Sequence, residues 1–344
     1  MRLKAAADLG VGFGRRRGRW VVAPIAWGSL AVWLIPAATA CVTVPAPIRD
    51  LNAVDYRIGM GATVVDPALR ARNDAAMEPV RTFLRLVSAA ADHFVADNKV
   101  AAGICTLAEL RQWAEGGALL GTMANMQAER ERAAVVGGLA FAYLKTRDQA
   151  LADDRKAIEP WLDKLAVAVE AAFAVEARPV SRSLALVGLA TMAVGAATGN
   201  RDHWRFGEAD YDRSLADING DGVLQVAMLG GERALFDQDF ALGSLVMMAE
   251  LAARQSGEDW YQRRGGAIHR LADRVLDGLR DPGWFTEQTG KGQFRPSGRD
   301  LAWIAFYARR FPERFAGRVP DGAIFQSPRL GGDLTTLAEK WVKN

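Results

Sequence analysis

Histidine, the side chain best suited to proton transfer and zinc binding near neutral pH, is scarce in this chain. His93, His203 and His269 are the only three among 344 residues, and none lies in an H-E-x-x-H or related ligand spacing. The sequence also contains no G-x-S-x-G motif and no phosphate-binding P-loop. These observations argue against a zinc enzyme, a serine hydrolase and a nucleoside triphosphatase, and we expect neither a metal nor a cofactor.

One polar loop has part of a calcium-binding pattern. The segment from Asp217 to Gly222 (D-I-N-G-D-G) places oxygen-bearing side chains at alternate positions and a glycine at the sharp turn. A bidentate acid should close such a loop at its twelfth position, which here is Met228. We therefore interpret the segment as a polar turn that follows a helix.

The elements that must position any site are helices. Apolar residues recur at helical spacing between Val80 and Phe94. Similar patterns cover Leu107–Leu120, Ala133–Leu144, Ile158–Phe173, Leu184–Ala197, Phe240–Ala253 and Ile268–Leu279. Only Ala62–Val65 looks extended, and it is too short to build a sheet. Paired helices joined by short polar loops predict an all-α bundle or toroid, with residues 41–344 as one domain.

Three local signals predict where helices begin and end. Thr106, with Glu109 three residues later, forms a capping-box pattern that predicts a helix starting at Leu107. The Gly116-Gly117 pair predicts the end of that helix. Pro160 suits the first turn of the helix that follows.

Residues 1–40 have the build of a secretory signal peptide. A basic cluster, Arg15–Arg19, precedes an apolar run from Trp20 to Pro36, and Ala38-Thr39-Ala40 supplies the small residues that signal peptidase accepts. We expect cleavage after Ala40, a periplasmic or secreted protein, and contact with the membrane only through this leader. Two alternatives stay open, an uncleaved membrane anchor and lipidation at Cys41.

The basic charge of the chain belongs to the leader. The first 40 residues hold six basic residues and one acidic residue, which leaves 37 basic and 39 acidic residues in the remainder. We therefore expect no nucleic acid partner.

Four stretches, in order, carry a resemblance to a known family. They are Cys105-Thr-Leu-Ala-Glu-Leu-Arg-Gln-Trp113-Ala114 with Gly117-Ala-Leu-Leu-Gly121; Gln127-Ala-Glu129 with Ala140-Phe-Ala-Tyr143-Leu-Lys145; Asp217–Gln225 with Arg233-Ala-Leu235 and Phe240-Ala-Leu242; and Gly331-Gly-Asp-Leu334. Residues 41–335 thereby resemble the alginate lyases, polysaccharide lyase family five. The resemblance implies an α/α toroid, or incomplete α/α barrel, and an anionic partner such as alginate or another polyuronate. It also favours a Cys41–Cys105 disulfide over two unrelated thiols.

The chemistry that the resemblance implies is β-elimination, but most of the implied catalytic residues differ here. The enzyme must neutralise the uronate carboxylate, remove the C5 proton and protonate the leaving oxygen. Aligned on Gly188, the family's Asn-His pair becomes Arg182-Ser183. The family's arginine is retained as Arg233, while its Y-H-N-Y run becomes Asp237-Gln238-Asp239-Phe240.

The departures leave four interpretations open. Catalysis would depend on Arg233, Asp237 and Ser183, although Asp237 is a base only if burial raises its pKa, and serine is a poor base. Substrate binding would use Arg182 and Arg233, whose guanidinium groups fit carboxylates, together with Gln127 and Trp113. The chain is then either a degenerate homologue that binds a uronate polysaccharide or an active polyuronate lyase with rearranged residues. A third is a buried network in which Arg182 and Arg233 pair with Asp237 or Asp239, and a fourth is a non-catalytic periplasmic partner. The tryptophans, Trp113 among them, are separately open to interpretation as core residues.

Overall fold

The structure is a computed structural model that describes residues 41–58, 64–173, 182–315 and 320–342. The predicted signal peptide, residues 1–40, lies outside the described residues. The described part of the chain contains no helix that is both long and apolar enough to cross a membrane.

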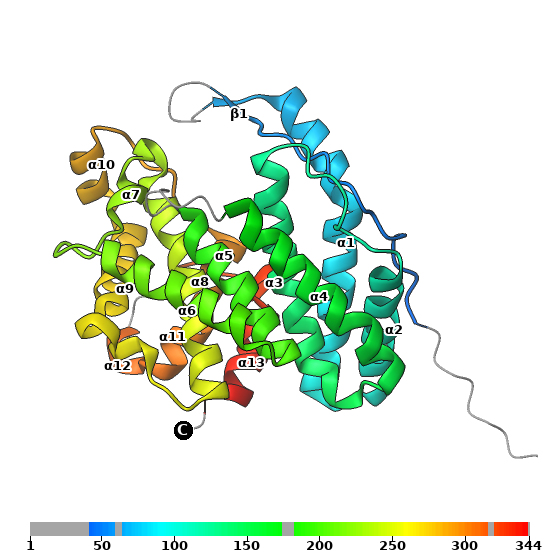
Figure 1. The fold of residues 1–344 in the computed structure, drawn as a ribbon. Coiled ribbons are helices and arrows are strands. Elements are labelled where there is room, and N and C mark those ends of the chain that lie inside the picture. Colours follow the sequence, from blue (N-terminus) through cyan, green and yellow to red (C-terminus); the bar gives the residue numbers. More distant parts are fainter. Residues whose placement is uncertain (1–40, 59–63, 174–181, 316–319, 343–344) are drawn as a thin grey trace, which may run out of the picture. The chain divides into compact units, whose positions relative to one another are not determined.

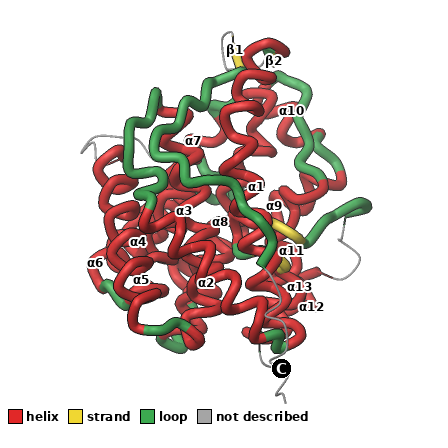
Figure 2. Tube along the Cα trace, turned by 90° about the vertical axis from the view of Figure 1, so that its right-hand side faces the viewer, coloured by secondary structure: helices red, strands yellow, loops and turns green. Residues whose placement is uncertain are grey.

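Most of the described chain is helical (Figure 2). The long helices are α1(Pro67–Asp97), α2(Val100–Glu115), α3(Met126–Thr146), α4(Ala152–Phe173), α5(Arg182–Thr198), α6(Arg201–Asp217), α8(Ala234–Gln255) and α9(Arg263–Arg280). The short ones are α7(Gln225–Met228), α10(Gly283–Thr289), α11(Ile304–Arg310), α12(Pro312–Phe315) and α13(Leu334–Trp341), with the 3-10 turns η1(Arg147–Gln149), η2(Gly231–Arg233), η3(Trp260–Gln262), η4(Gly298–Trp303) and η5(Pro328–Leu330). The described chain also contains two antiparallel pairs of two-residue strands. They are β1(Arg57–Ile58) with β2(Val64–Val65) and β3(Gln326–Ser327) with β4(Gly332–Asp333).

The helices form an α/α toroid, which confirms the expected fold class. Helices α3, α5 and α8 are buried on nearly all sides, and α5 packs against α3, α4, α6 and α8. Around them, α4, α6 and α9 bury one face each, and α1 and α9 lie on opposite sides of the unit (Figure 1). The core therefore sits between an inner and an outer layer of helices. The ends of the inner helices can contribute side chains to a site.

Small residues bring the inner and outer helices close together. A Cβ atom added to Gly207 of α6 would lie 2.5 Å from the Cβ of Met192 and 2.6 Å from the carbonyl oxygen of Gly188, both in α5. No side chain fits in that space, so glycine at both positions lets the two helices pack backbone to backbone.

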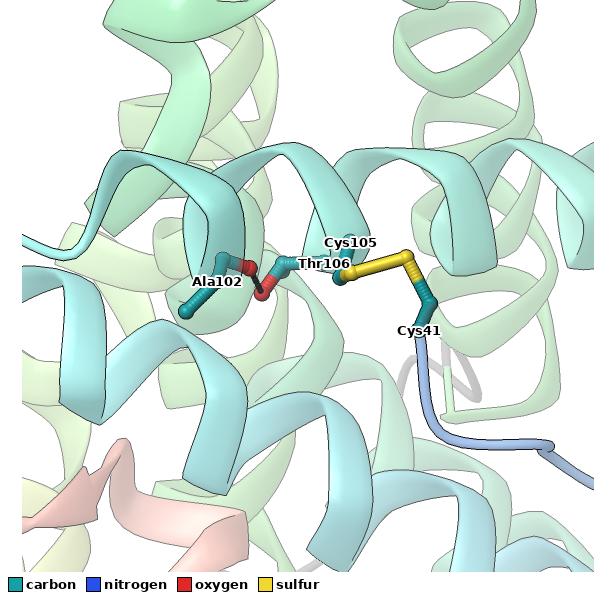
Figure 3. Close-up of a disulfide and its surroundings, with 4 residues drawn as sticks. All are labelled: Cys41, Ala102, Cys105 and Thr106. Atoms are coloured by element: carbon teal, nitrogen blue, oxygen red, sulfur yellow. Dashed lines mark hydrogen bonds between the residues drawn. A yellow bond between two sulfur atoms is a disulfide. The ribbon is translucent and has the colours of Figure 1, made fainter. Parts of the chain in front are cut away.

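The predicted Cys41–Cys105 disulfide is confirmed (Figure 3). The Cα atoms lie 5.4 Å apart and the bond joins the first described residue to the middle of α2 across a sequence separation of 64. Chain-entropy estimates for a loop of this length give roughly 4 kcal/mol of stabilisation. A sulfur held in this bond carries no diacylglyceryl group, so the disulfide is incompatible with lipidation at Cys41.

Two of the predicted helix starts are wrong. Thr106 lies inside α2, where its Oγ1 donates to the carbonyl oxygen of Ala102 at 3.0 Å, so the helix extends upstream to Val100. Pro160 lies well inside α4 rather than in its first turn. In both cases the packing of a longer apolar face outweighs a local end signal. The predicted end is confirmed, because α2 stops at Glu115 and Gly117 adopts a positive φ of 62°.

The loop after α6 is a polar turn, as interpreted. The Oδ1 atom of Asn219 accepts hydrogen bonds from the amides of Asp221 and Val223 at 3.0 and 3.2 Å. Asp217 accepts a hydrogen bond from the amide of Val226 at 3.2 Å. These oxygens are turned toward the backbone, and no cluster of metal-binding side chains occurs within the described ranges.

A buried ion pair fixes the C-terminal segment on the inner helices. Lys145 of α3 is paired with Asp92 of α1 and donates to the carbonyl oxygen of Gly331, while Asp92 accepts a hydrogen bond from the amide of Asp333 at 2.9 Å. The side chain of Lys145 is only 2% exposed. This network holds η5, and with it Arg329, at a defined place beside α3.

Candidate functional site

The amino-terminal ends of the three inner helices open into a cavity of about 260 Å³. Gln127 lies in the first turn of α3, where the side chain of Asn125 caps the helix by accepting from the amides of Gln127 and Ala128. Ser183 lies in the first turn of α5, and Arg233 directly precedes α8. Because helix amino termini carry partial positive charge, this end of the toroid favours an anion.

Four of the six predicted site residues line this cavity. They are Gln127, Ser183, Arg233 and Asp237. Arg182 begins α5 beside Ser183, but its side chain lies outside the described part of the structure.

Trp113 lies elsewhere, in the core. It is fully buried and stacks on Phe83 with ring centroids 3.6 Å apart, and its Nε1 donates to the carbonyl oxygen of Pro45 at 2.9 Å. Trp113 therefore supports the fold and does not contact the cavity, in agreement with the core interpretation of the tryptophans.

Arg233 and Asp237 form a buried ion pair. Their Nη2 and Oδ1 atoms lie 3.1 Å apart, and the residues are 8% and 3% exposed. The guanidinium of Arg233 also lies 4.7 Å from the ring centroid of Phe236, a cation–π distance. For Arg233, the structure contains the buried pair with Asp237 that one of the alternatives describes. Asp237 already accepts a charge-assisted hydrogen bond, which makes it a poor general base.

The most prominent residue that sequence reasoning missed is Arg329, at the centre of η5. Its guanidinium lies 4.3 Å from the ring centroid of Phe240, and its Nη1 atom is buried with no hydrogen-bond partner in the described part of the chain. A buried donor without a partner is costly, and an anionic ligand would satisfy it. The sequence signal was the nearby Gly331-Gly332 pair, of which Gly332 fits tightly against Asp92 and Gly331 against Phe141.

Asp239 does not neutralise this arginine near neutral pH. Burial raises the pKa of Asp239 to about 8, and its Oδ1 atom accepts a hydrogen bond from Nε1 of Trp303 at 2.8 Å. Asp239 is therefore largely protonated at pH 7, and it compensates little of the positive charge of Arg329.

The Asp239→Asn variant is expected to remove a pH dependence of stability. Because the native state binds a proton that the unfolded state releases above about pH 4, the free energy of unfolding should fall as pH rises from about 4 to 8. The free energy of unfolding of the variant minus that of wild type should increase by on the order of 2–4 kcal/mol between pH 5 and pH 8, as measured by denaturant unfolding. Asp221→Asn, on an exposed loop, is the control. An equal pH dependence in wild type and Asp239→Asn would contradict this account.

Gln127 links two charged residues across the cavity wall. Its Nε2 donates to Oε1 of Glu131 at 3.1 Å, and its Oε1 accepts from Nε and Nη2 of Arg130 at 3.1 and 2.9 Å. Burial raises the pKa of Glu131, an effect opposed by nearby Arg81 and Arg130. The polar wall is therefore organised before any ligand arrives, which reduces the entropic cost of binding.

None of the three histidines, all in the described part of the chain, lines the cavity. His93 is exposed on α1, and His203 is buried with Nδ1 2.7 Å from Oε1 of Glu170. His269 is buried with Nδ1 2.8 Å from the hydroxyl of Tyr307. Proton transfer in the cavity would instead depend on Tyr56 and Glu131, which both line it.

The charge and ring content of the cavity suit an anionic ligand with flat faces. Its lining includes four arginines (Arg57, Arg130, Arg233 and Arg329) against the two carboxyl groups of Glu131 and Asp237. Three aromatic rings, those of Tyr56, Phe236 and Phe240, complete the wall. Guanidinium groups bind carboxylates through paired hydrogen bonds, and aromatic faces pack against apolar faces of a ligand.

Comparisons with known proteins agree with this architecture. The family model described as "Alginate lyase" matches residues 61–285. A polysaccharide lyase of Stenotrophomonas maltophilia (strain K279a) is 40% identical over 317 residues, covering 89% of this chain and 93% of that protein. An alginate lyase of Cobetia marina is 29% identical over 246 residues, covering 68% and 65%.

Solved structures show the same fold. Alginate lyase A1-III from Sphingomonas species A1 has a TM-score of 0.74 at 24% identity, with 88% of this chain and 86% of that chain covered. A single-site variant of alginate lyase A1-III complexed with a tetrasaccharide has a TM-score of 0.74 at 23% identity, with 86% and 85% covered. In fold and sequence, the chain is thus a polysaccharide lyase homologue. More narrowly, it belongs to the alginate lyase family.

Proposed function

We propose that this protein binds an anionic uronate polysaccharide in the cavity at the amino-terminal ends of α3, α5 and α8, and holds it without cleaving it by the family reaction. One observation carries the proposal: the Nη1 atom of Arg329 is buried with no hydrogen-bond partner among the described residues, in a cavity lined by four arginines and two carboxyl groups. A uronate carboxylate is the chemical complement of that guanidinium. The polyuronate substrates implied by family membership point to the same class of ligand.

The absence of cleavage follows from the residues at the proton-transfer positions. Ser183 stands where the family has histidine, and Phe240 stands where it has a tyrosine. Serine without a basic partner removes a proton poorly, and phenylalanine has no proton to give. Arginines that neutralise the carboxylate remain, so binding is retained while the proton transfers of β-elimination lose their groups.

Titration calorimetry with a tetrauronate tests the proposed binding. We expect saturable heat, with affinity that falls as salt rises because the contacts are ionic. A neutral tetrasaccharide of the same length is the control and should give no heat. Equal binding of the neutral and charged oligomers, or none of either, would contradict the proposal.

A second candidate function is a rearranged lyase. It is favoured by Tyr56 and Glu131 in the same cavity. The phenol of Tyr56 can exchange a proton, and so can the carboxyl group of Glu131, whose pKa is raised by burial. Absorbance at the wavelength of unsaturated uronates, followed over a panel of polyuronates, would detect its product. Activity that is present in wild type and lost in both Tyr56→Phe and Glu131→Gln would establish this function, whereas no absorbance change with any polymer would leave binding alone.

We propose that the protein acts outside the cytoplasm. A basic cluster, an apolar run and a small-residue site precede residue 41, and the described chain begins with a disulfide-bonded cysteine, a bond typical of exported proteins. Protein isolated from the producing cell should begin at Cys41, as N-terminal sequencing would show. A chain that still begins at Met1 in the membrane fraction would identify the leader as an anchor.

A further inference from the structure

A buried carboxyl group lies behind the wall of the cavity. Asp239 precedes Phe240, whose ring centroid lies 4.3 Å from the guanidinium carbon of Arg329, and Asp239 is only 1% exposed. Its Oδ1 atom accepts the hydrogen bond from Nε1 of Trp303, while its Oδ2 atom has no hydrogen-bond partner among the described residues. Because Nη1 of Arg329 lacks such a partner too, the carboxyl group and the guanidinium act on each other through charge.

Close packing keeps Asp239 in this place. Both η4 and η5 pack on α8. A Cβ atom added to Gly243, one helical turn after Asp239, would lie 3.4 Å from Cδ1 of Trp303 and 3.5 Å from Cδ1 of Leu330. Trp303, which donates to Asp239, and Leu330, which follows Arg329, therefore cover the same face of α8. The carboxyl group cannot reach water while these contacts hold.

The surroundings of Asp239 favour its protonated form near neutral pH. A carboxylate away from water with a single indole donor is costly, so burial alone favours the neutral acid. Two charged groups from other elements act on it. Arg329 of η5 lowers its pKa and Asp300 of η4 raises it, but burial dominates and the pKa is about 8. On α8 itself, Arg233 and Asp237 are paired with each other.

A carboxylate bound to Arg329 changes this balance. It compensates the one positive charge that favours ionised Asp239, and it adds a negative charge of its own, so it should raise the pKa of Asp239 further. Linkage is reciprocal: a ligand that makes the proton bind more tightly is itself bound more tightly by the protonated protein.

We propose that Asp239 makes the binding of the polyuronate proton-dependent, so that Arg329 holds the ligand carboxylate most tightly when Asp239 is protonated. This inference rests on the proposed function. Ionised Asp239 compensates the charge of Arg329 from behind the wall, so a ligand that binds this form draws one proton from solvent onto the carboxyl group. Acidification from alkaline pH toward neutrality then strengthens binding, and alkaline pH favours release.

Titration calorimetry with a tetrauronate at pH 7 and pH 9, at constant ionic strength, tests this inference. The affinity of wild type should be roughly three- to tenfold lower at pH 9, as linkage to one group with a pKa of about 8 requires. Asp239→Asn keeps the shape of the protonated carboxyl group but does not titrate, so its affinity should be equal at the two pH values. Glu131→Gln, which removes the titratable carboxyl group of α3 in the cavity, is the matched control and should keep the wild-type dependence.

A count of protons adds a measurement that a purely structural role would not change. At about pH 8.5, calorimetry in two buffers with different ionisation enthalpies should show uptake of about half a proton to one proton per ligand in wild type. Asp239→Asn should show none. Thermal melts at each pH establish that every variant is folded.

The outcomes separate this inference from the proposed function. Binding that is equal at pH 7 and pH 9 in wild type, or an equal loss in Asp239→Asn, would overturn the role of Asp239 and leave polyuronate binding intact. A pH dependence that disappears in Glu131→Gln instead would assign it to the other carboxyl group and overturn the role of Asp239 as well. No binding at either pH would overturn the proposed function and, with it, this inference.

Discussion

Replacing Arg329 with methionine should weaken the binding of a tetrauronate by roughly 10- to 100-fold, because one or two charge-assisted hydrogen bonds would be lost. The buried Nη1 atom of Arg329 has no partner among the described residues and the ring of Phe240 supports its guanidinium, so the side chain is ready for a carboxylate. Methionine keeps the packing against Phe240 without the charge. Titration calorimetry on wild type and variant gives the ratio of affinities.

The conservative variant Arg329→Lys is the control for that result. Lysine keeps the positive charge but not the planar fork, so its affinity should fall between those of wild type and Arg329→Met. Because Arg329 forms no ion pair within 4 Å in the described chain, both variants should melt close to wild type. Unchanged affinity in Arg329→Met would remove this residue from the site.

Arg233→Ala should have its main effect on stability. Its buried partner Asp237 would lose the guanidinium 3.1 Å away, and removing one member of a buried ion pair costs about 3–5 kcal/mol. For a domain of this size the melting temperature should fall by roughly 10 °C. Scanning calorimetry on wild type and variant measures the difference.

A double variant separates the lost pair from the lost side chain. Arg233→Met/Asp237→Leu removes both charges and fills the same space, so it should recover most of the stability that Arg233→Ala loses. If Arg233→Ala melted within about 2 °C of wild type, the ion pair would contribute little to stability, and this account of it would be wrong.

The fold was largely predictable because apolar periodicity is a local signal. The stripe from Val80 to Phe94 lies in α1, and each of the other predicted helical segments overlaps a helix of the toroid. Helix ends were predicted less well, since Thr106 bonds to its own helix and Pro160 is tolerated inside α4. In both places the tertiary packing of a long helix outweighs a preference worth about 1 kcal/mol or a single missing hydrogen bond.

The site was predictable only where its residues follow one another in family-like segments. Gln127, Ser183, Arg233 and Asp237 could be placed by order and spacing, and all four line the cavity. Arg329 could not, because it reaches the site from η5 through the contacts of Lys145 with Asp92 and Gly331.

Arg57 and Tyr56 belong to the same category as Arg329. They line the cavity because the chain before α1 crosses the start of α3, an arrangement that the disulfide and the Leu51–Met123 bridge stabilise. Such contacts between distant segments leave no periodic trace in the sequence.

Equilibrium dialysis of a tetrauronate against this protein, followed by analysis of the recovered oligomer, tests the central claim most directly. The oligomer should accumulate on the protein side at low salt and be recovered with its original length and no unsaturated end. Equal concentrations on both sides would contradict the binding claim. Shortened oligomers that absorb as unsaturated uronates would show that the cavity performs β-elimination after all.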